Sequence, residues 1–406
     1  MAQRRYIVLK SDTPQYAGTL DGLFGISGPT ASMRGPREDL SVDLVDLSRA
    51  DLLDLERNPS VKAVAPPMPV RLIEPASRGT DGPVANPGVS TWGIRAVGAD
   101  ASPLDGSGVA VAVLDTGIDL SHAAFSGMGN IERMNFTPDG PDDVDGHGTH
   151  VAGTIFGRDV NGTRIGVARG IEKALVGKVL DDNGSGSTDR IYEAILWADQ
   201  AGADIISMSL GFDFPGFSAR LIAQGFPEDL ATSIALEAYR ANVRLFDALA
   251  ESLKARALFD QSASLCIAAS GNESHREMHP DWVLGTAPPA AADGFVSVGA
   301  LGKKNPDADP MFVAPFSNTG VTVSAPGVDV VSAQVGSGNG LVSFDGTSMA
   351  TPHVAGVAAL WAQRIKQQTG TVQHGRLMGR LLGNAQALTE LDSWDVGLGI
   401  VRAPQQ

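Results

Sequence analysis

Mostly apolar runs alternate with helical patterns along the larger part of this 406-residue chain. Four of the runs read as strands buried on both faces, because apolar side chains dominate each one without the alternation of a half-exposed strand. They are residues 109–114, 203–210, 265–269 and 295–301. Strands that alternate with helices predict an α/β fold with a doubly wound, mostly parallel sheet and helices on both faces. In such sheets, ligands bind beyond the carboxyl ends of the strands.

The longest helical pattern covers residues 227–259. Pro227 suits its first turn, because the first helical position needs no backbone N–H. One face of the pattern is apolar and carries Tyr239, Val243, Phe246, Leu249 and Leu253. We expect a single helix that is long for a globular protein, where three to four turns are usual.

Residues 1–74 predict a separate, small α+β unit. Strands are expected at residues 6–9 and 42–45. Ser48 and Asp51 have the spacing of a capping box, so a short helix should begin there and end before Asn58-Pro59.

The rest of this unit is expected to be extended or irregular, and a linker should follow it. Residues 61–73 are extended and interrupted by prolines, and residues 11–38 suggest no element. Residues 75–91 predict a linker, because Gly and Pro are frequent around Glu74–Pro87. We expect any processing cut to fall within 74–87.

Charge and composition exclude several classes of protein, such as those that bind nucleic acid, contain disulfides or span a membrane. The 31 basic and 46 acidic residues give a net charge of −15, which argues against nucleic acid or an anionic membrane as a partner. The single cysteine, Cys266, excludes an intrachain disulfide. The longest apolar stretch, residues 354–362, is too short to span a bilayer, which takes about 18 residues. The amino terminus does not read as a signal peptide. We therefore expect a cytoplasmic protein as written, or a secreted one if a leader has been removed.

Three short segments carry candidate chemistry. An acid, Asp115, ends a predicted buried strand; His147 opens a helix among glycines; and Ser348 opens another helix. Taken singly, each has an ordinary structural explanation as a strand end, a turn or a helix N-cap. His147 and His150 also have a spacing that suits metal binding on one helix face, but a third ligand is missing there.

Taken together, the three segments are far more specific. Asp, then His, then Ser is one of the known chain orders of the acyl-transfer triad. The surrounding motifs match as well, and the sequence resembles the subtilisin-like (subtilase) serine peptidases from about Trp92 to Pro404, with one insertion. The match includes the closing motif at residues 395–400.

This resemblance implies a serine endopeptidase that works through an acyl-enzyme. Ser348 would be the nucleophile, His147 its general base, and Asp115 the residue that orients the imidazole. Asn272 would donate its side-chain amide to the oxyanion, beside the backbone N–H of Ser348. The chemistry requires no cofactor.

The resemblance also implies where a polypeptide substrate binds. Two segments would flank an extended peptide as β-partners: Gly184, Ser185 and Gly186, and Ser209, Leu210 and Gly211. Glycine at these points lets one backbone approach another. The alternative is that both segments are simple glycine turns.

Residues 50–64 resemble the second half of a subtilase inhibitor-type propeptide. The first 74 residues would then be an intramolecular inhibitor whose carboxyl end lies in the active-site cleft until cleavage. An accessory domain without that role is the alternative. Residues 92–406 would form the catalytic domain.

Two departures from the family pattern limit the transfer. The usual calcium ligand nine residues after Asp115 is Ala124 here, and Val160 takes the place of a second ligand. We therefore do not expect the usual calcium site, while a structural cation elsewhere stays open. An insertion of about 30 residues would fall within 212–259. It could be a lid, a surface for a partner, a dimer contact or a helix packed on the domain.

Three functions remain open at this point. The leading prediction is a serine endopeptidase restrained by its N-terminal domain until autoprocessing. A self-locked scaffold that binds peptides or a partner is the second, and a dedicated processing protease for one partner is the third.

Overall fold

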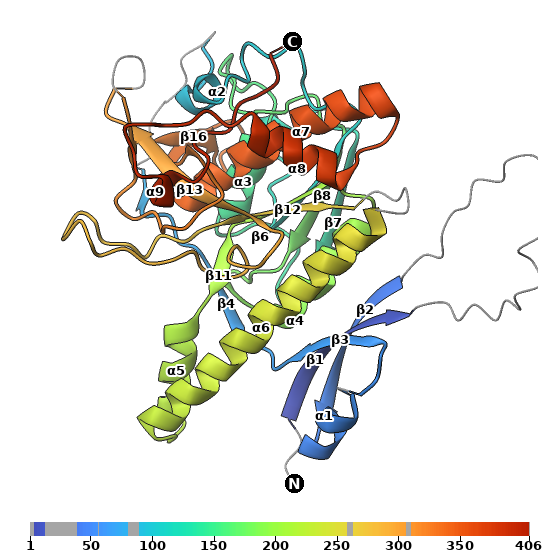
Figure 1. The fold of residues 1–406 in the computed structure, drawn as a ribbon. Helices are drawn as coiled ribbons and strands as arrows, with labels where there is room; N and C mark the ends of the chain where they lie inside the picture. The colour runs from blue at the N-terminus through green and yellow to red at the C-terminus, as the bar shows by residue number, and fades with distance from the viewer. Residues whose placement is uncertain are drawn as a thin grey trace, which may run out of the picture.

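A computed structural model describes residues 4–12, 39–55, 57–79, 89–257, 263–305 and 310–405. Its centre is an eight-stranded sheet in the order β14-β13-β12-β10-β6-β8-β7, with β15 beside β13 (Figure 1). Every pairing in it is parallel except that of β14 with β13. The strands are β6 (Ala110–Asp115), β7 (Asn130–Asn135), β8 (Lys173–Lys178), β10 (Ile205–Met208), β12 (Leu265–Ala269), β13 (Val296–Lys303), β14 (Met311–Val313) and β15 (Val323–Pro326).

The strands of the predicted apolar runs, β6, β10, β12 and β13, are buried on both faces, whereas the edge strand β7 is mostly exposed. Along β6, Val111 and Val113 belong to one core, while Ala112 and Leu114 belong to the other. Helices α3 and α7 contribute to the first core, and α4 and α6 to the second. The predicted fold class is therefore confirmed. The helices of this domain are α2 (Trp92–Ala96), α3 (His147–Phe156), α4 (Thr188–Gln200), α5 (Phe214–Ala223), α6 (Glu228–Ala257), α7 (Thr347–Thr369), α8 (His374–Gly383) and α9 (Ser393–Val396).

A small antiparallel sheet, ordered β2-β1-β3, lies at the amino-terminal end of the chain (Figure 1). Its elements are β1 (Arg4–Asp12), β2 (Asp39–Leu47), α1 (Arg49–Leu55) and β3 (Val61–Ala65). The predicted capping box is confirmed, because Ser48 N donates to Asp51 Oδ2 (2.7 Å) and Asp51 N donates to Ser48 Oγ (3.3 Å). Most of the unassigned segment 11–38 lies outside the described residues.

The chain then enters the larger domain as a strand. Strand β4 (Pro69–Leu72) pairs antiparallel with both β9 (Ser185–Ser187) and β11 (Leu210–Phe212). Farther on, β5 (Ser77–Arg78) pairs with β17 (Leu341–Asp345), which pairs with β16 (Val330–Ala333). The predicted linker thus begins in a short strand, and residues 80–88 lie outside the described part.

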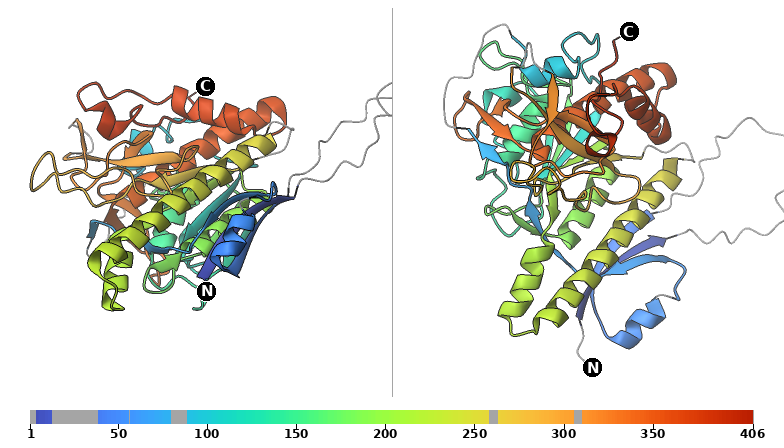
Figure 2. Two further views of the ribbon diagram at one scale, coloured as in Figure 1. Left: turned by 60° about the horizontal axis from the view of Figure 1, so that its bottom comes forward. Right: turned by 60° about the vertical axis from the view of Figure 1, so that its left-hand side comes forward.

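The long helix expected over 227–259 is confirmed as α6, and the insertion also contains a shorter helix, α5, that the sequence did not predict. Figures 1 and 2 show α5 and the first half of α6 as a hairpin that projects from the domain. The second half of α6 packs on the core, where Phe246 is fully buried with its ring 4.3 Å from that of Tyr192. Beside it, Asn242 Nδ2 donates to Pro66 O (2.8 Å), so α6 also contacts the N-terminal unit. Among the described helices, none has the length and apolar character needed to cross a membrane.

We predict that Phe246→Ala lowers the free energy of unfolding by about 3–5 kcal/mol, since it leaves a cavity among aromatic rings. Leu230→Ala, at an exposed position of the projecting half of α6, should change it by less than about 0.5 kcal/mol. Urea unfolding of both variants in a Ser348→Ala background measures the difference. Equal effects would contradict the distinction between a packed and a projecting half.

Candidate active site

Asp115 and His147 meet at the carboxyl edge of the sheet. Asp115 is the last residue of β6 and His147 the first residue of α3. His147 Nδ1 lies 2.8 Å from Asp115 Oδ1, and both side chains are fully buried. Asp115 Oδ1 also accepts a hydrogen bond from Thr116 N (2.8 Å). The pairing places the imidazole so that its Nε2 remains available for another group.

The pKa of His147 is set by two opposed effects. Burial lowers this pKa, but the charge of Asp115 and the hydrogen bond to it raise the pKa and outweigh burial. The net pKa therefore lies above that of an ordinary histidine. A neutral His147 can accept a proton, and the raised pKa makes it a stronger base once it is neutral.

A second acid, Asp143, fixes the loop that carries His147. Its carboxylate is buried and accepts hydrogen bonds from Thr116 Oγ1 (2.8 Å), Gly146 N (2.9 Å), Thr149 N (2.8 Å) and Thr149 Oγ1 (2.6 Å). These bonds join the end of β6 to the start of α3. The sequence prediction missed Asp143; an acid four residues before the histidine was the available signal.

Ser348 lies in the first turn of α7 and faces the chain's own N-terminal segment. Its Oγ donates to Ile73 O (2.9 Å). His147 Nε2 is buried and has no hydrogen-bond partner in the described structure. Helices α3 and α7 pack against each other, so Ser348 and His147 belong to the same region of the molecule. The base–nucleophile hydrogen bond is not formed while Ser348 is bonded to Ile73.

Asn272 is held in a fixed orientation beside Ser348. Its Oδ1 accepts hydrogen bonds from Thr347 N (2.9 Å) and Thr347 Oγ1 (2.8 Å). These two donors assign the oxygen, so the Nδ2 group must point the other way. Nδ2 donates to Glu74 O (2.8 Å). The side chain therefore presents a pre-oriented donor to a carbonyl group of the bound strand.

The two predicted substrate-binding segments both border β4. Leu72 N donates to Gly184 O (2.7 Å), and Ile73 N donates to Ser209 O (3.4 Å). In the register of the sheet, Gly186 lies opposite Val70 and Gly211 opposite Arg71. A Cβ on Gly211 would come within 3.3 Å of the Ile73 side chain. Ser185 and Leu210 are the first residues of β9 and β11, the two strands that pair with β4. An extended peptide backbone can thus pair on both of its edges here.

The other polar groups of these motifs have structural partners. His150 Nε2 is bonded to Val330 O and His353 Nδ1 to Met349 O. Burial lowers the pKa of His150 to about 3 and that of His353 to about 4, so both are neutral. Burial raises the pKa of the Cys266 thiol, which keeps this cysteine protonated. None of the three acts as a base or nucleophile in this arrangement.

The residues at the usual calcium position do not fit a cation. Ala124 and Val160 are buried apolar residues. The Ala124 carbonyl, a potential ligand, accepts instead from Arg158 N (2.7 Å). A calcium ion needs several oxygen ligands, with carboxylates among them. Across the described ranges, no cluster of three His, Cys, Asp or Glu side chains could hold a metal.

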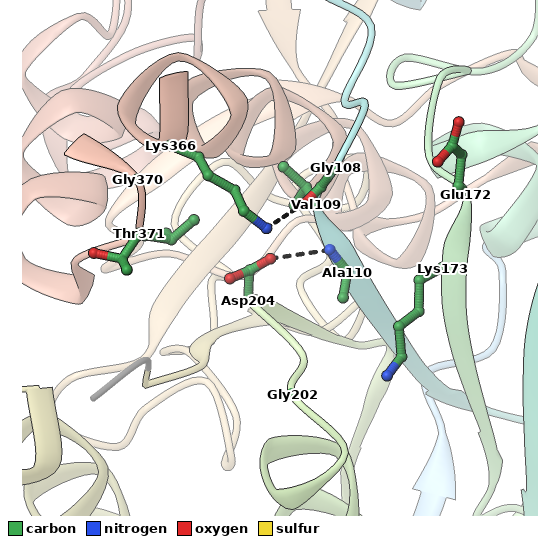
Figure 3. A pocket seen from close by; sticks show the side chains of 11 residues that line it. Gly108, Val109, Ala110, Glu172, Lys173, Gly202, Asp204, Lys366, Gly370 and Thr371 are labelled. Carbon is green, nitrogen blue, oxygen red and sulfur yellow. Dashed lines mark hydrogen bonds between the residues drawn. The ribbon is translucent and has the colours of Figure 1, made fainter. Parts of the chain in front are cut away.

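A separate hollow of about 440 Å³ lies at the amino ends of β6, β8 and β10, at the opposite edge of the sheet (Figure 3). Three of its charged side chains, Lys173, Asp204 and Lys366, form hydrogen bonds with the backbone. Lys366 Nζ donates to Gly108 O (2.6 Å), and Asp204 Oδ2 accepts from Ala110 N (2.9 Å). Burial raises the pKa of Asp204. This hollow contains none of the predicted site residues.

Comparison of the sequence with models of known protein families identifies the family of this chain. The model of the subtilase family matches residues 106–392, more than two thirds of the chain. The chain belongs to the subtilase family. As a member, it is a subtilisin-like serine endopeptidase, the activity that its sequence predicts. Polypeptides are accordingly its substrates.

Several characterised relatives are similar over most of the chain. A thermostable alkaline protease of Halalkalibacterium halodurans is 32% identical over 82% of this chain and 75% of its own length. Alkaline elastase YaB of a Bacillus strain is 32% identical over 92% of this chain and 84% of its own length. M-protease of Shouchella clausii is 34% identical over 76% of this chain and 67% of its own length.

We predict that peptide hydrolysis falls with decreasing pH as His147 becomes protonated, with a midpoint above about 6.5, the usual histidine pKa. In Asp115→Asn the pKa-raising charge is lost, so the midpoint should move to lower pH. The maximal rate should fall about 10⁴-fold, because the imidazole tautomer is no longer fixed. The pH profile of kcat/KM for both proteins measures this, and an unchanged midpoint in Asp115→Asn would contradict it.

Proposed function

We propose that Ser348, His147 and Asp115 carry out the peptide-bond hydrolysis, with the N-terminal domain as the first occupant of the site. The observation that carries this proposal is the position of β4. The chain's own strand pairs with both bordering segments, and the carbonyl oxygen of Ile73 lies 2.9 Å from Ser348 Oγ. A peptide carbonyl group therefore lies next to Ser348 Oγ, the atom that would attack it.

The roles follow from the chemistry of each group. Ser348 is a weak nucleophile until His147 Nε2 takes its proton, and Nε2 is the unpartnered nitrogen of a histidine held by Asp115. The imidazolium formed in this step is stabilised by Asp115 and later returns the proton to the leaving amine. Because the reaction uses a side-chain nucleophile and base, no cofactor enters it.

Asn272 and the start of α7 would stabilise the oxyanion. The Asn272 Nδ2 group points toward the bound strand, because Thr347 donates two hydrogen bonds to Oδ1 on the other side of the amide. The Ser348 backbone N–H belongs to the first turn of a 23-residue helix, where the helix dipole also favours negative charge. In the intact chain Asn272 bonds to Glu74 O, so it must turn to the Ile73 oxygen for the reaction.

We assign the first cleavage to the bond between Ile73 and Glu74. Ser348 Oγ contacts the Ile73 carbonyl oxygen, and the Ile73 side chain is buried against Gly211, next to Ala287. The following bond, Glu74–Pro75, has a less favourable geometry because its proline nitrogen belongs to a tertiary amide. The proposed cut lies directly before the window 74–87 that the sequence predicts. The location of the protein in the cell stays a prediction.

Intact-mass measurements test this proposal. Wild-type protein should lose residues 1–73, expose a new amino terminus at Glu74, and then bind a fluorophosphonate probe at Ser348. The rate of cleavage should not depend on protein concentration, because the strand is delivered by the same chain. Ser348→Ala is the matched control and should remain at 42.1 kDa without probe.

Other outcomes of this experiment have distinct meanings. A new terminus at Pro75 or beyond would reject the assignment of the bond. A chain that binds the probe yet stays intact would reject self-cleavage but keep the endopeptidase. A wild-type chain that neither changes mass nor binds the probe would favour the alternative, a self-locked scaffold that binds peptides.

A further inference from the structure

Arg71 differs from the rest of β4 in the direction of its side chain. Val70 and Leu72 are buried, as alternate residues of a strand against a core should be. The Arg71 side chain between them is 49% exposed and borders a hollow of about 350 Å³. Arg71 is the third residue before the proposed scissile bond.

Two carboxylates from distant parts of the sequence face the Arg71 guanidinium. Nη2 lies 3.6 Å from Glu273 Oε1, and Nη1 lies 4.0 Å from Asp213 Oδ1. Glu273 follows the oxyanion residue Asn272, and Asp213 begins the helical insertion. The planar guanidinium has donors on both sides, so one arginine can address both acids.

Both carboxylates are positioned by the catalytic domain itself. Glu273 Oε2 accepts from Asn318 Nδ2 (2.8 Å), and the buried Asn318 in turn accepts from Glu273 N (3.2 Å). Asp213 caps α5 by accepting from Gly216 N (3.0 Å). Asp213 also forms an ion pair with Arg220 (3.6 Å), which partly neutralises its negative charge. Glu273 is therefore the stronger of the two partners.

The insertion adds an aromatic wall to the same hollow. Phe212, Phe214 and Tyr239 line it, and the rings of Phe212 and Phe214 lie 5.9 Å and 6.0 Å from that of Tyr239. Such a wall can pack against the aliphatic part of a long cationic side chain. It also lowers the local dielectric, which strengthens attraction to the two carboxylates.

On the basis of the proposed function, we propose that Asp213 and Glu273 form a subsite that selects an arginine or lysine at the substrate position held here by Arg71. Backbone pairing with β9 and β11 fixes the side on which each substrate residue points. Any polypeptide in this groove thus presents its third residue before the cleaved bond to the two acids. The preferred substrates carry a basic residue there, followed by two apolar residues.

Quenched peptides with the sequence of residues 69–76 and Arg, Gln or Glu at the position of Arg71 test the subsite. Full-length wild-type protein, after incubation and with its active-site concentration determined by fluorophosphonate on a separate aliquot, should cut the Arg peptide about fivefold faster than the Gln peptide in kcat/KM. The Glu peptide should be slower still. High salt should reduce the preference, because exposed charges are screened.

The double variant Asp213→Asn/Glu273→Gln should lose this preference while it still cuts the Gln peptide. Each substitution keeps a side-chain oxygen, which can still cap α5 or accept from Asn318, so both hydrogen bonds are kept and only the exposed ion pair of Asp213 with Arg220 is lost. Glu237→Gln is the matched control: it removes an exposed carboxylate of α6 that is not an ion-pair partner of Arg71. It should leave the preference unchanged.

A second measurement does not depend on catalysis. In a Ser348→Ala background, Arg71→Gln should raise amide hydrogen exchange of residues 70–73 about fivefold, and the acid double variant should do the same. Combining all three substitutions should add nothing further. Equal cleavage of the three peptides, or additive effects on exchange, would overturn the subsite. Active sites that fail to titrate would instead reject the proposed function, with the exchange result still deciding the subsite.

Discussion

The antiparallel pairing of β4 within the substrate groove is the interaction on which the arrangement of the site depends. β9 and β11 are only three residues long each, and their facing edges would otherwise leave backbone donors and acceptors without partners. β4 satisfies both edges at once, and its register determines which residue lies where. Ile73 reaches Ser348, Glu74 reaches Asn272, and Arg71 turns toward two acids. These positions follow from backbone geometry, so a substrate strand of another sequence would inherit them.

The N-terminal sheet acts as an anchor for that strand. Only residues 66–68 separate β3 from β4, and Met68 is buried with its N–H bonded to Thr188 Oγ1 (3.0 Å). Asn242 of α6 holds Pro66, the first residue of this connection. Because the strand is tethered so closely, its local concentration at the groove is very high. Hydrolysis of the proposed bond would leave all of these contacts in place, so cutting and release would be separate events.

Local sequence signals predicted the elements that carry the proposed catalytic residues well. The strand ending at Asp115, the helix opening at His147 and the first turn of α7 at Ser348 all lie where spacing indicates. These signals act through backbone conformation within a few residues. The position of the chain segment of β4 in the cleft was expected only from the family resemblance. Its two partner strands, β9 and β11, are more than a hundred residues away in the sequence.

The parts that the sequence did not predict share a physical reason. Helix α5 is short and follows strand β11 almost directly, so its pattern of apolar positions cannot be separated from that of the strand. Asp143 and Asn318 act through several backbone bonds each, and no periodicity marks such a residue. The pairing of Arg71 with Glu273 joins residues about two hundred positions apart. Contacts of that kind depend on the assembled fold rather than on any local pattern.

The contacts around the proposed scissile bond explain why the intact chain can persist. Upstream, β4 fixes Ile73; downstream, Ala76 N bonds to Asp345 O (2.7 Å) and β5 pairs with β17. Between these two supports, the Ser348 proton is engaged by Ile73 O and the Asn272 amide by Glu74 O. In the proposed reaction, both would have to change partners: the proton would pass to His147 Nε2 and the amide would turn to the Ile73 oxygen. The same hydrogen bonds that hold the peptide at Ser348 would therefore also delay the proposed cleavage.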